Sequence, residues 1–262
     1  MMKVLMLGEV VGIPTVKEIR KSLKKVIETE KIDFVVANAD GASDGYGILA
    51  DTAYQLHNAG VDVITGGDYI FNKKDIKEFL GKFPRILRPY NLPKETVGRG
   101  FMLVQLENGK KIGVMNVLGR TGFQKIFAND PFYVIDGAIE KMRESTNIII
   151  VDFHGGTTSE IQAMHWYLRG KVSLVAGTHL RVLTTDCRII GDHTGVVSGL
   201  GYCGGYYSVG GLSFETEIKK IRSGQFMYSK VASENIILQG IIAEIDEETG
   251  KTLRIDLYEK KL

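Results

Sequence analysis

Five side chains of types that commonly bind metals or transfer protons each follow an apolar stretch of this sequence. They are Glu9, Asp40, Asp68, His154 and His179. Carboxylate and imidazole groups together suit zinc, iron or manganese. Each residue alone has a structural explanation, because a carboxylate after a strand often caps a helix and a lone histidine is usually hydrogen-bonded within the fold. The five together favour a metal or phosphate site. A structural or solvent-facing position is expected for the other histidines, His57, His165 and His193.

These residues can meet only if the apolar stretches before them are neighbouring strands. The stretches are residues 4–7, 34–37, 61–65, 147–153 and 172–176. Segments with helical periodicity separate them, and strands that alternate with helices predict an α/β fold with parallel pairing. Loops at the carboxyl ends of such strands converge at one edge of a sheet, where ligands bind. We therefore expect the site at the C-terminal edge of the strands.

Later segments predict antiparallel strands. Asn108-Gly109 joins apolar runs at 102–106 and 111–117, and Asn-Gly in that setting is a strong hairpin signal, so the sheet is expected to gain antiparallel strands there. Further hairpins are predicted within 182–200 and 236–258, and a short helix over 214–221. The predicted fold class is therefore α/β, with mixed β-sheets flanked by helices.

Length and composition indicate one globular domain over residues 1–262, with the hairpin at about 234–260 as an extension. The net charge of +2 gives no reason to expect a nucleic-acid duplex as partner, although a small nucleotide is compatible with it. No apolar run approaches the ~20 residues of a membrane span. Cys187 and Cys203 lack C-x-x-C spacing and indicate reduced thiols in a soluble, cytoplasmic protein. The long strands of the last hairpin favour a homo-oligomer, because exposed edges are usually covered.

Motifs around the two histidines are the most specific signals in the chain. They are Val151-Asp152-Phe153-His154, Thr158-Ser159-Glu160, Trp166-Tyr167-Leu168 and Gly177-Thr178-His179. With Leu87-Arg88-Pro89, Gly98-Arg99-Gly100, Gly119-Arg120 and Asp130-Pro131-Phe132, they resemble the YmdB-like branch of the calcineurin-type metallophosphoesterases, from the first strand to about Gly205. The resemblance implies a calcineurin-like phosphoesterase fold, a two-metal centre that often holds iron, and hydrolysis of cyclic nucleotide phosphodiesters such as 2′,3′-cyclic AMP.

One half of the centre that the resemblance implies is kept in this sequence. The positions of the family's second metal ion, which is held by a bridging Glu, an Asn and two His, are Asp40, Asp68, His154 and His179. All four can bind a metal ion. Asp in place of Glu shortens the bridge by one methylene, and Asp in place of Asn adds a negative charge.

The other half departs from the family pattern. The positions of the first metal ion are Glu9, Asp40, Gly41 and Arg181. Gly41 has no side-chain ligand, and Arg181 cannot deprotonate to offer a lone pair. Its guanidinium is expected to pair with Glu9 and Asp40, roughly where a cation would stand. The family's proton-donating His is replaced by Tyr69, whose unperturbed pKa of ~10 makes it a poorer donor near neutrality.

These departures define the functional hypothesis. We expect a divergent metallophosphoesterase with one divalent metal ion per chain or none, namely iron, manganese or zinc, and with weak, altered or absent hydrolysis of a small phosphodiester or nucleotide. The first alternative is an active phosphodiesterase in which Arg181 stabilises transition-state charge and Tyr69 donates a proton. The second is a metal-free protein that binds a nucleotide or phosphate as a signal through Arg181, Arg120 and its glycine-rich loops.

Overall fold

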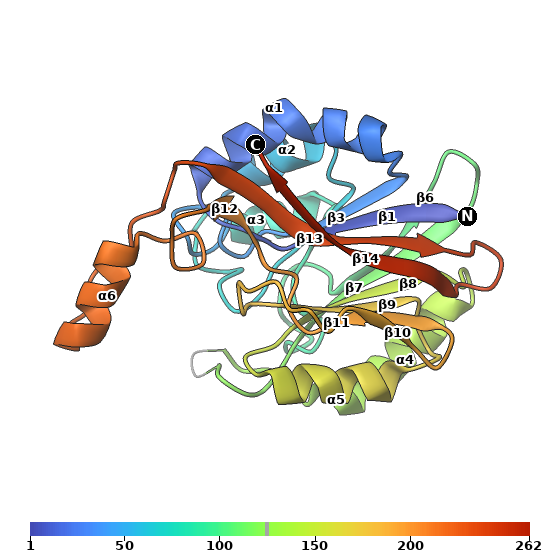
Figure 1. Ribbon diagram of the computed structural model, residues 1–262. Coiled ribbons are helices and arrows are strands. Elements are labelled where there is room, and N and C mark those ends of the chain that lie inside the picture. Colours follow the sequence, from blue (N-terminus) through green and yellow to red (C-terminus); the bar gives the residue numbers. More distant parts are fainter. Residues whose placement is uncertain (124–125) are drawn as a thin grey trace.

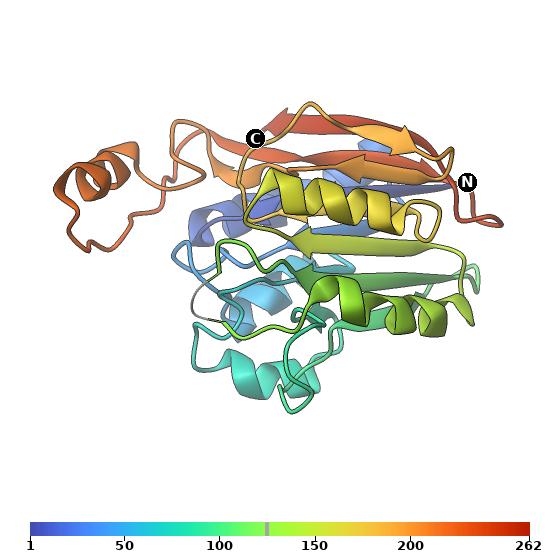
Figure 2. The same cartoon turned by 90° about the horizontal axis from the view of Figure 1, so that it is seen from below.

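The computed structural model describes residues 1–123 and 126–262. Over these residues the chain forms two β-sheets packed face to face, with helices on both outer faces (Figure 1). Helices α1 (Ile13–Glu30), α2 (Ala50–Asn58) and α3 (Ile76–Lys82) cover the first sheet, and α4 (Pro131–Arg143) and α5 (Thr158–Leu168) cover the second (Figure 2). This arrangement confirms the predicted α/β class with mixed sheets flanked by helices.

Within the described part of the chain, the first sheet has eight strands in the order β2-β12-β13-β1-β3-β4-β5, with β14 paired to β13. Their bounds are β1 Met2–Leu7, β2 Glu9–Val10, β3 Phe34–Asn38, β4 Val63–Thr65, β5 Ile86–Leu87, β12 Tyr202–Gly205, β13 Ile236–Ile245 and β14 Thr252–Lys261. The strands β1, β3 and β4 pair in parallel, as the repeated strand–helix pattern predicted, and β5 adds a further parallel strand beside β4. The strand β13 lies between β12 and β1, antiparallel to both, so the last hairpin is built into this sheet.

The second sheet has six strands in the described residues, in the order β10-β11-β9-β8-β7-β6. Their bounds are β6 Phe101–Gln105, β7 Lys111–Leu118, β8 Ile149–His154, β9 Leu174–Thr178, β10 Arg188–Ile190 and β11 Thr194–Val197. The Asn-Gly hairpin is confirmed as β6–β7, but its expected place in the same sheet as the first strands is wrong, because β7 pairs with β8. The hairpin predicted within 182–200 is confirmed: β10 pairs with β11, and an isolated antiparallel bridge joins Leu183 to Leu200 farther from the turn.

The continuous apolar runs of β1 and β3 are explained by burial on both faces. Leu5 and Val35 pack toward the helices of the first sheet, whereas Val4 and Phe34 pack toward the second sheet. Because successive strand residues point to opposite faces, both faces of such a strand must be apolar when both are covered. The two sheets therefore share one apolar interface, and the residues at its open end lie close to strands of both.

Local signals set the helix boundaries near the site. Pro14 occupies the first turn of α1, where its missing N–H costs nothing, and Thr157 caps α5 by accepting a hydrogen bond from the Glu160 N–H. The predicted helix over 214–221 is confirmed as α6 (Phe214–Ser223), which has no buried residue and projects from the body (Figure 1). Among the described residues, no helix combines the length and the apolar character needed to cross a membrane.

Candidate functional site

The five side chains singled out from the sequence lie at the same edge of the molecule, between the two sheets. From the first sheet come Glu9 in β2, Asp40 after β3 and Asp68 after β4. From the second come His154, the last residue of β8, and His179, which follows β9. The edge is formed by the carboxyl ends of the parallel strands, so the topology accounts for the convergence.

The tightest group in this set consists of Asp68, His154 and His179. One ligand atom from each lies within 4.8 Å of the others. His154 Nε2 is 3.1 Å from Asp68 Oδ1, and His179 Nδ1 is 3.5 Å from the same oxygen. Two imidazoles and a carboxylate aimed at one point form a ligand set suited to a transition metal or zinc.

Asp40 stands beside this group but is held differently. Its Oδ2 lies 3.8 Å from His154 Nε2 and accepts a hydrogen bond of 2.8 Å from the backbone N–H of Tyr69. Its other oxygen, Oδ1, is buried and has no hydrogen-bond partner in the described residues. A buried carboxylate oxygen without a hydrogen-bond donor is costly, so Asp40 Oδ1 calls for a donor or a cation that the described residues do not supply.

Glu9 and Arg181 form a buried ion pair next to Asp40. Arg181 Nη2 is 2.5 Å from Glu9 Oε1 and donates to the carbonyl of Gly45 at 2.8 Å, while Nη1 donates to the carbonyl of Gly210 at 3.3 Å. The expected pairing of Arg181 with Glu9 is therefore present. Within the described residues no ion pair joins Arg181 to Asp40, and Glu9 Oε2 is buried without a partner.

Glycines make room for these contacts at two positions. A Cβ on Gly41 would lie 2.7 Å from Glu9 Oε1 and 2.8 Å from Arg181 Nη2. A Cβ on Gly67 would lie 2.2 Å from His154 Nε2. The missing side chain at Gly41 is thus a condition of the Glu9–Arg181 pair, and the missing side chain at Gly67 is a condition of the His154 ring position.

The chain turns sharply where it delivers His179 and Arg181. Both residues have positive φ angles, 84° for His179 and 51° for Arg181. Such angles are uncommon for residues with a Cβ and are found most often where a site constrains the backbone. The turn lets His179 join the second-sheet side of the site while Arg181 reaches Glu9.

Burial and charge shift the titration of the acids and of His154. Burial alone would raise the pKa of Asp68, but hydrogen bonds from His154 and His179 outweigh it and hold the pKa well below its usual range. Burial alone would lower the pKa of His154, but its contacts with Asp68 and Asp40 raise that pKa to about 9. Burial raises the pKa of Asp40 to about 7. The groups titrate together, as closely spaced charges do.

Tyr69 lines a cavity of about 400 Å³ that opens beside Asp68. Phe71 and Phe123 also line it, and the Phe123 ring centroid lies 4.8 Å from that of His179. Burial raises the pKa of Tyr69 to about 12, and the charge of Asp68 adds to the effect. The cavity is large enough for a small organic phosphate, and the aromatic rings give it an apolar wall.

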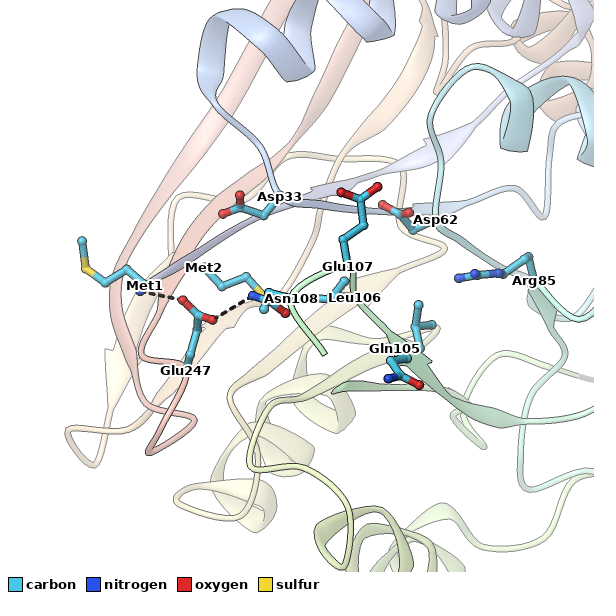
Figure 3. Close-up of a pocket in the computed structure, with 11 residues that line it drawn as sticks. Met1, Met2, Asp33, Asp62, Arg85, Gln105, Leu106, Glu107, Asn108 and Glu247 are labelled. Carbon is cyan, nitrogen blue, oxygen red and sulfur yellow. Dashed lines mark hydrogen bonds and ion pairs between the residues drawn. The ribbon is translucent and has the colours of Figure 1, made fainter. Parts of the chain in front are cut away.

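A second, larger cavity lies at the opposite edge of the sheets. It has a volume of about 610 Å³ and is lined by Asp33, Asp62 and Glu107 among others (Figure 3). The carboxylates of Asp33 and Asp62 accept hydrogen bonds from the backbone N–H groups of Lys3 and Val35, at 2.7 and 2.8 Å. Asp33 and Asp62 therefore bind the backbone near the starts of β1 and β3. The cluster of carboxylates and histidines lies at the opposite edge.

The remaining histidines lie away from the cluster. His57 Nδ1 contacts the carbonyl of Val61 at 2.9 Å, and His193 Nδ1 contacts that of Val172 at 3.3 Å. His165 is buried on α5, and burial lowers its pKa to about 4. These placements agree with the structural positions expected for them.

Four polar residues behind His154 were missed at the level of single residues. Asp152 and Thr178 lie on the second sheet, and Asn38 and Thr65 at the strand ends of the first, all of them buried. The signal in the sequence is a polar residue inside or at the end of an otherwise apolar strand, where it must find a hydrogen-bond partner. Phe123 was also missed, because no pattern marks one aromatic residue in a loop.

Comparison with known sequences gives matches over nearly the whole chain. A family model described as YmdB-like protein matches residues 5–257. A 2′,3′-cyclic-nucleotide 2′-phosphodiesterase of Bacillus subtilis is 34% identical over 255 residues, which cover 97% of this chain and 96% of that protein. A putative phosphatase/phosphodiesterase of Mycoplasma genitalium is 30% identical over 260 residues, covering 97% and 91%.

Solved structures share the fold. A hypothetical protein from Thermus thermophilus superimposes with a TM-score of 0.90 at 27% identity and covers 99% of both chains. A phosphatase from Mycoplasma pneumoniae superimposes with a TM-score of 0.92 at 27% identity, over 99% of this chain and 93% of that one. The stacked mixed sheets with outer helices are therefore an architecture that this chain shares with a phosphatase.

Proposed function

The chain belongs to the YmdB-like family, and from this premise we propose that it is a metal-dependent hydrolase of a small phosphodiester that works with one metal ion and is weakly active. The observation that carries the proposal is the adjacency of two unlike half-sites. Asp68, His154 and His179 offer a metal-binding cluster, and the Glu9–Arg181 ion pair stands where the resemblance places a second ion.

The residues present fit one divalent ion. Ligands about 2.1 Å from a tetrahedral ion lie about 3.4 Å apart. The donor atoms of Asp68, His154 and His179 are separated by 3.1 and 3.5 Å, and Asp40 Oδ2 lies 3.8 Å from His154 Nε2. The partnerless Oδ1 of Asp40 is a further carboxylate oxygen that a cation would satisfy. We propose Asp40, Asp68, His154 and His179 as the ligands of iron, manganese or zinc.

A divalent ion held there would polarise a phosphoryl oxygen and lower the pKa of a water molecule, which is the chemistry that phosphodiester hydrolysis needs. Around it the chain supplies position and charge. Phe123 packs against both histidine rings, with its ring centroid 5.7 Å from that of His154 and 4.8 Å from that of His179. The cavity lined by Tyr69 and Phe71 lies next to Asp68 and can receive the organic part of a substrate.

Weak activity follows from the other half-site. Two metal ions about 4 Å apart normally clamp the attacking and leaving oxygens together. The guanidinium of Arg181 contributes a fixed positive charge, yet it is committed to Glu9 and to the carbonyls of Gly45 and Gly210. It therefore neutralises the buried Glu9 carboxylate and has little capacity left for a phosphoryl group.

The same contacts weigh against the two alternatives. An active phosphodiesterase that relies on Tyr69 as proton donor is disfavoured, because burial raises the pKa of Tyr69 to about 12. A metal-free protein that binds phosphate through Arg181 is disfavoured, because this side chain already has a buried carboxylate partner. Arg120, the other arginine of that hypothesis, pairs with Asp130 at 2.9 Å on the surface.

Metal content and hydrolysis together test the proposal. The purified protein is treated with chelator, loaded with Mn²⁺ or Zn²⁺ and dialysed, and its metal content and hydrolysis of bis(p-nitrophenyl) phosphate are measured. We expect close to one ion per chain and slow hydrolysis, both lost in His154→Ala and both kept in the control His193→Ala, which removes an imidazole far from the cluster. Two ions per chain would overturn the one-metal assignment, and no bound ion would overturn the proposal.

A gain-of-function variant tests why the activity is weak. Gly41→Asn, Tyr69→His and Arg181→His together replace the departures by the residue types that the resemblance implies. The triple variant should bind a second ion and hydrolyse the same substrate faster than the parent. No gain in metal content or rate would show that these positions do not limit activity.

The proposal also covers the cellular location and the oligomeric state of the protein. Cys187 and Cys203 are both free thiols, and Cys203 is buried, which supports a reducing, cytoplasmic location. We retain the homo-oligomer as a prediction. Sedimentation of the purified protein measures its mass directly.

A further inference from the structure

Behind the proposed metal ligands lies a buried polar cluster, here called the Asp152 network, formed by Asp152, Asn38, Thr65 and Thr178. The side chains come from four strands, with β3 and β4 in the first sheet and β8 and β9 in the second. Each residue is at most 1% exposed. A group of this kind, buried between two apolar sheets, is costly unless it is fully hydrogen-bonded, so its retention calls for a role.

Asp152 is the acceptor at the centre of the network. Its Oδ1 accepts a hydrogen bond of 2.6 Å from the Thr178 hydroxyl, and its Oδ2 accepts one of 2.9 Å from Asn38 Nδ2 and one from the Thr65 hydroxyl. A carboxylate only accepts, so each hydroxyl must spend its single proton on Asp152. The Thr178 oxygen is left with lone pairs only.

That constraint determines where His154 carries a proton. Thr178 Oγ1 lies 3.0 Å from His154 Nδ1, and since the hydroxyl proton points to Asp152, the imidazole must be the donor in this contact. One ring proton is therefore held on Nδ1. The opposite nitrogen, Nε2, is the atom that faces Asp68 and Asp40.

Asn38 extends the control to the acidic side of the site. Its Oδ1 accepts from the backbone N–H of Asp40 at 3.1 Å, which fixes the amide orientation, and its Nδ2 donates to Asp152 and to the carbonyl of Gly66 at 2.9 Å. Gly66 begins the loop that carries Asp68. The Asp152 carboxylate is therefore connected through Asn38 to the loops of Asp40 and Asp68. It is also connected to Thr178, which contacts His154 and directly precedes His179.

We propose that Asp152 is a positioning residue for the metal centre: through Thr178 it holds one His154 proton on Nδ1, so that Nε2 is the nitrogen that gives up its proton to a metal ion, and through Asn38 it sets the loops of Asp40 and Asp68. This inference rests on the proposed function, in that it assigns a task toward the metal ion placed there. Hydrogen bonds of this kind orient metal ligands and strengthen their binding.

The test breaks the hydrogen-bond relay from Asp152 through Thr178 to His154 and keeps the size of the side chain at position 178. Thr178→Val replaces the hydroxyl by a methyl group, Thr178→Ser keeps the hydroxyl, and Thr194→Val is the matched control. Thr194 is also fully buried on the second sheet, and its hydroxyl donates to the carbonyl of Val172 at 2.7 Å, but it has no contact with the network. Zn²⁺ affinity is measured by competition with a chelator, and unfolding by urea is measured alongside.

Zn²⁺ affinity should fall roughly 10- to 100-fold in Thr178→Val. Thr178→Ser and Thr194→Val should stay within about threefold of the parent, even if Thr194→Val is destabilised to a similar degree. Asp152→Asn should match Thr178→Val where it folds. Equal affinities for the Val and Ser variants, or an equal loss in Thr194→Val, would overturn the proposal, because the relay would then have no effect of its own.

Proton–nitrogen-15 spectra of the His154 ring provide a second readout that does not depend on metal binding. In metal-free protein, the Nδ1 proton should exchange slowly with water in the parent and in Thr178→Ser, and faster in Thr178→Val. If the parent binds no Zn²⁺, the proposed function fails while the ring spectra still test the relay. An Nδ1 proton that exchanges as fast in the parent as in Thr178→Val would overturn the inference.

Discussion

Arg181 determines, at the scale of single residues, how much negative charge the site must balance. Its guanidinium lies 2.5 Å from Glu9 in a setting where Glu9 is 2% exposed. Burial alone would lower the pKa of Arg181, but the charge of Glu9 and its hydrogen bond raise that pKa above its usual value, so the side chain stays charged. A permanent cation thus balances Glu9, and the proposed metal ion has only Asp40 and Asp68 to balance.

The first prediction concerns this pair. Removing one partner of a buried ion pair strands the other, and Arg181→Met should therefore lower the free energy of unfolding by about 3–5 kcal/mol in the presence of chelator. The double variant Glu9→Gln/Arg181→Met should lose much less than the sum of the single changes. Urea unfolding of the four proteins measures the coupling, and additive losses would contradict a direct interaction.

A second prediction concerns competition between protons and metal. The raised pKa of His154, about 9 in the metal-free protein, means that a metal ion must displace a proton from this ring. Metal affinity should then increase with pH between 7 and 9, by roughly tenfold per unit, and level off above that range. Calorimetric titration in buffers of different ionisation enthalpy counts the released protons. An affinity that does not change with pH would contradict the assignment of His154 as a ligand.

The sequence was enough to predict which polar residues lie together, but not the hydrogen bonds behind them. The apolar runs before Asp40, Asp68 and His154 were enough to place these residues at one edge, because parallel strands share their carboxyl ends. The link from Asp152 to His154 through Thr178 joins neighbouring strands at a particular register, and register is set by tertiary packing that a single sequence does not display. The partnership of Arg181 and Glu9 was expected, whereas its exclusion of a side chain at Gly41 required coordinates.

The loop that contains Gly67, after β4, leaves no room for a side chain at that position. A Cβ there would lie 2.2 Å from His154 Nε2. Gly67→Ala should therefore displace the ring and weaken Zn²⁺ binding by at least tenfold. Gly137→Ala is the matched control, since Gly137 is exposed on α4 and a Cβ there would have no described neighbour within 4 Å. It should stabilise the helix by about 0.5–1 kcal/mol. Unchanged binding in Gly67→Ala would show that the loop can relax.

The helix α5 carries a pH-sensitive residue that is independent of the site. Burial lowers the pKa of His165 to about 4. Between pH 6.5 and 4 this histidine is therefore protonated in the unfolded chain but remains neutral in the folded chain. Stability should therefore fall as the pH falls through this window, by roughly 3 kcal/mol from this group. His165→Leu should remove that part of the slope in urea unfolding at several pH values. Parallel curves for parent and variant would contradict the assignment.

Elements were predicted well where periodicity was long and less well where pairing decided the outcome. The helix pattern after Pro14 and the Asn108-Gly109 turn are local signals, and both gave the observed elements. The hairpin expected within 182–200 is present, but its ladder is interrupted between the Leu183–Leu200 bridge and β10. There the backbone N–H groups of Ser198 and Gly199 donate to the side chains of Asp186 and Thr184, and a single sequence does not show that side chains take the place of the ladder.

At the scale of the whole molecule, the important fact is that the site is shared by two sheets. The Asn-Gly hairpin was expected in the same sheet as the first strands, since nothing in a run of β-α units shows where one sheet stops. Asp152 on β8 and Asn38 on β3 bridge the sheets at this edge by a hydrogen bond of 2.9 Å. Relative movement of the sheets would therefore separate the acidic ligands from the histidines.

The projecting helix α6 gives a prediction about the body from which it extends. Ile218 and Ile221 are exposed, and the helix has no buried residue. Replacing both by Ser should change the free energy of unfolding of the chain by less than about 0.5 kcal/mol, because no packing is lost. Urea unfolding measures this. A large loss would contradict the exposed placement, and a fall in sedimenting mass would identify α6 as a contact of the predicted homo-oligomer.

The crowding around Gly41 constrains the order in which this site can change. While Arg181 pairs with Glu9, a side chain at position 41 has no room. If Arg181 is exchanged first, the buried Glu9 carboxylate loses its counter-charge. Either single step toward a second metal ion passes through a less stable protein, and only the paired exchange avoids it. On the proposed one-metal assignment, a second ion therefore cannot easily be gained one substitution at a time.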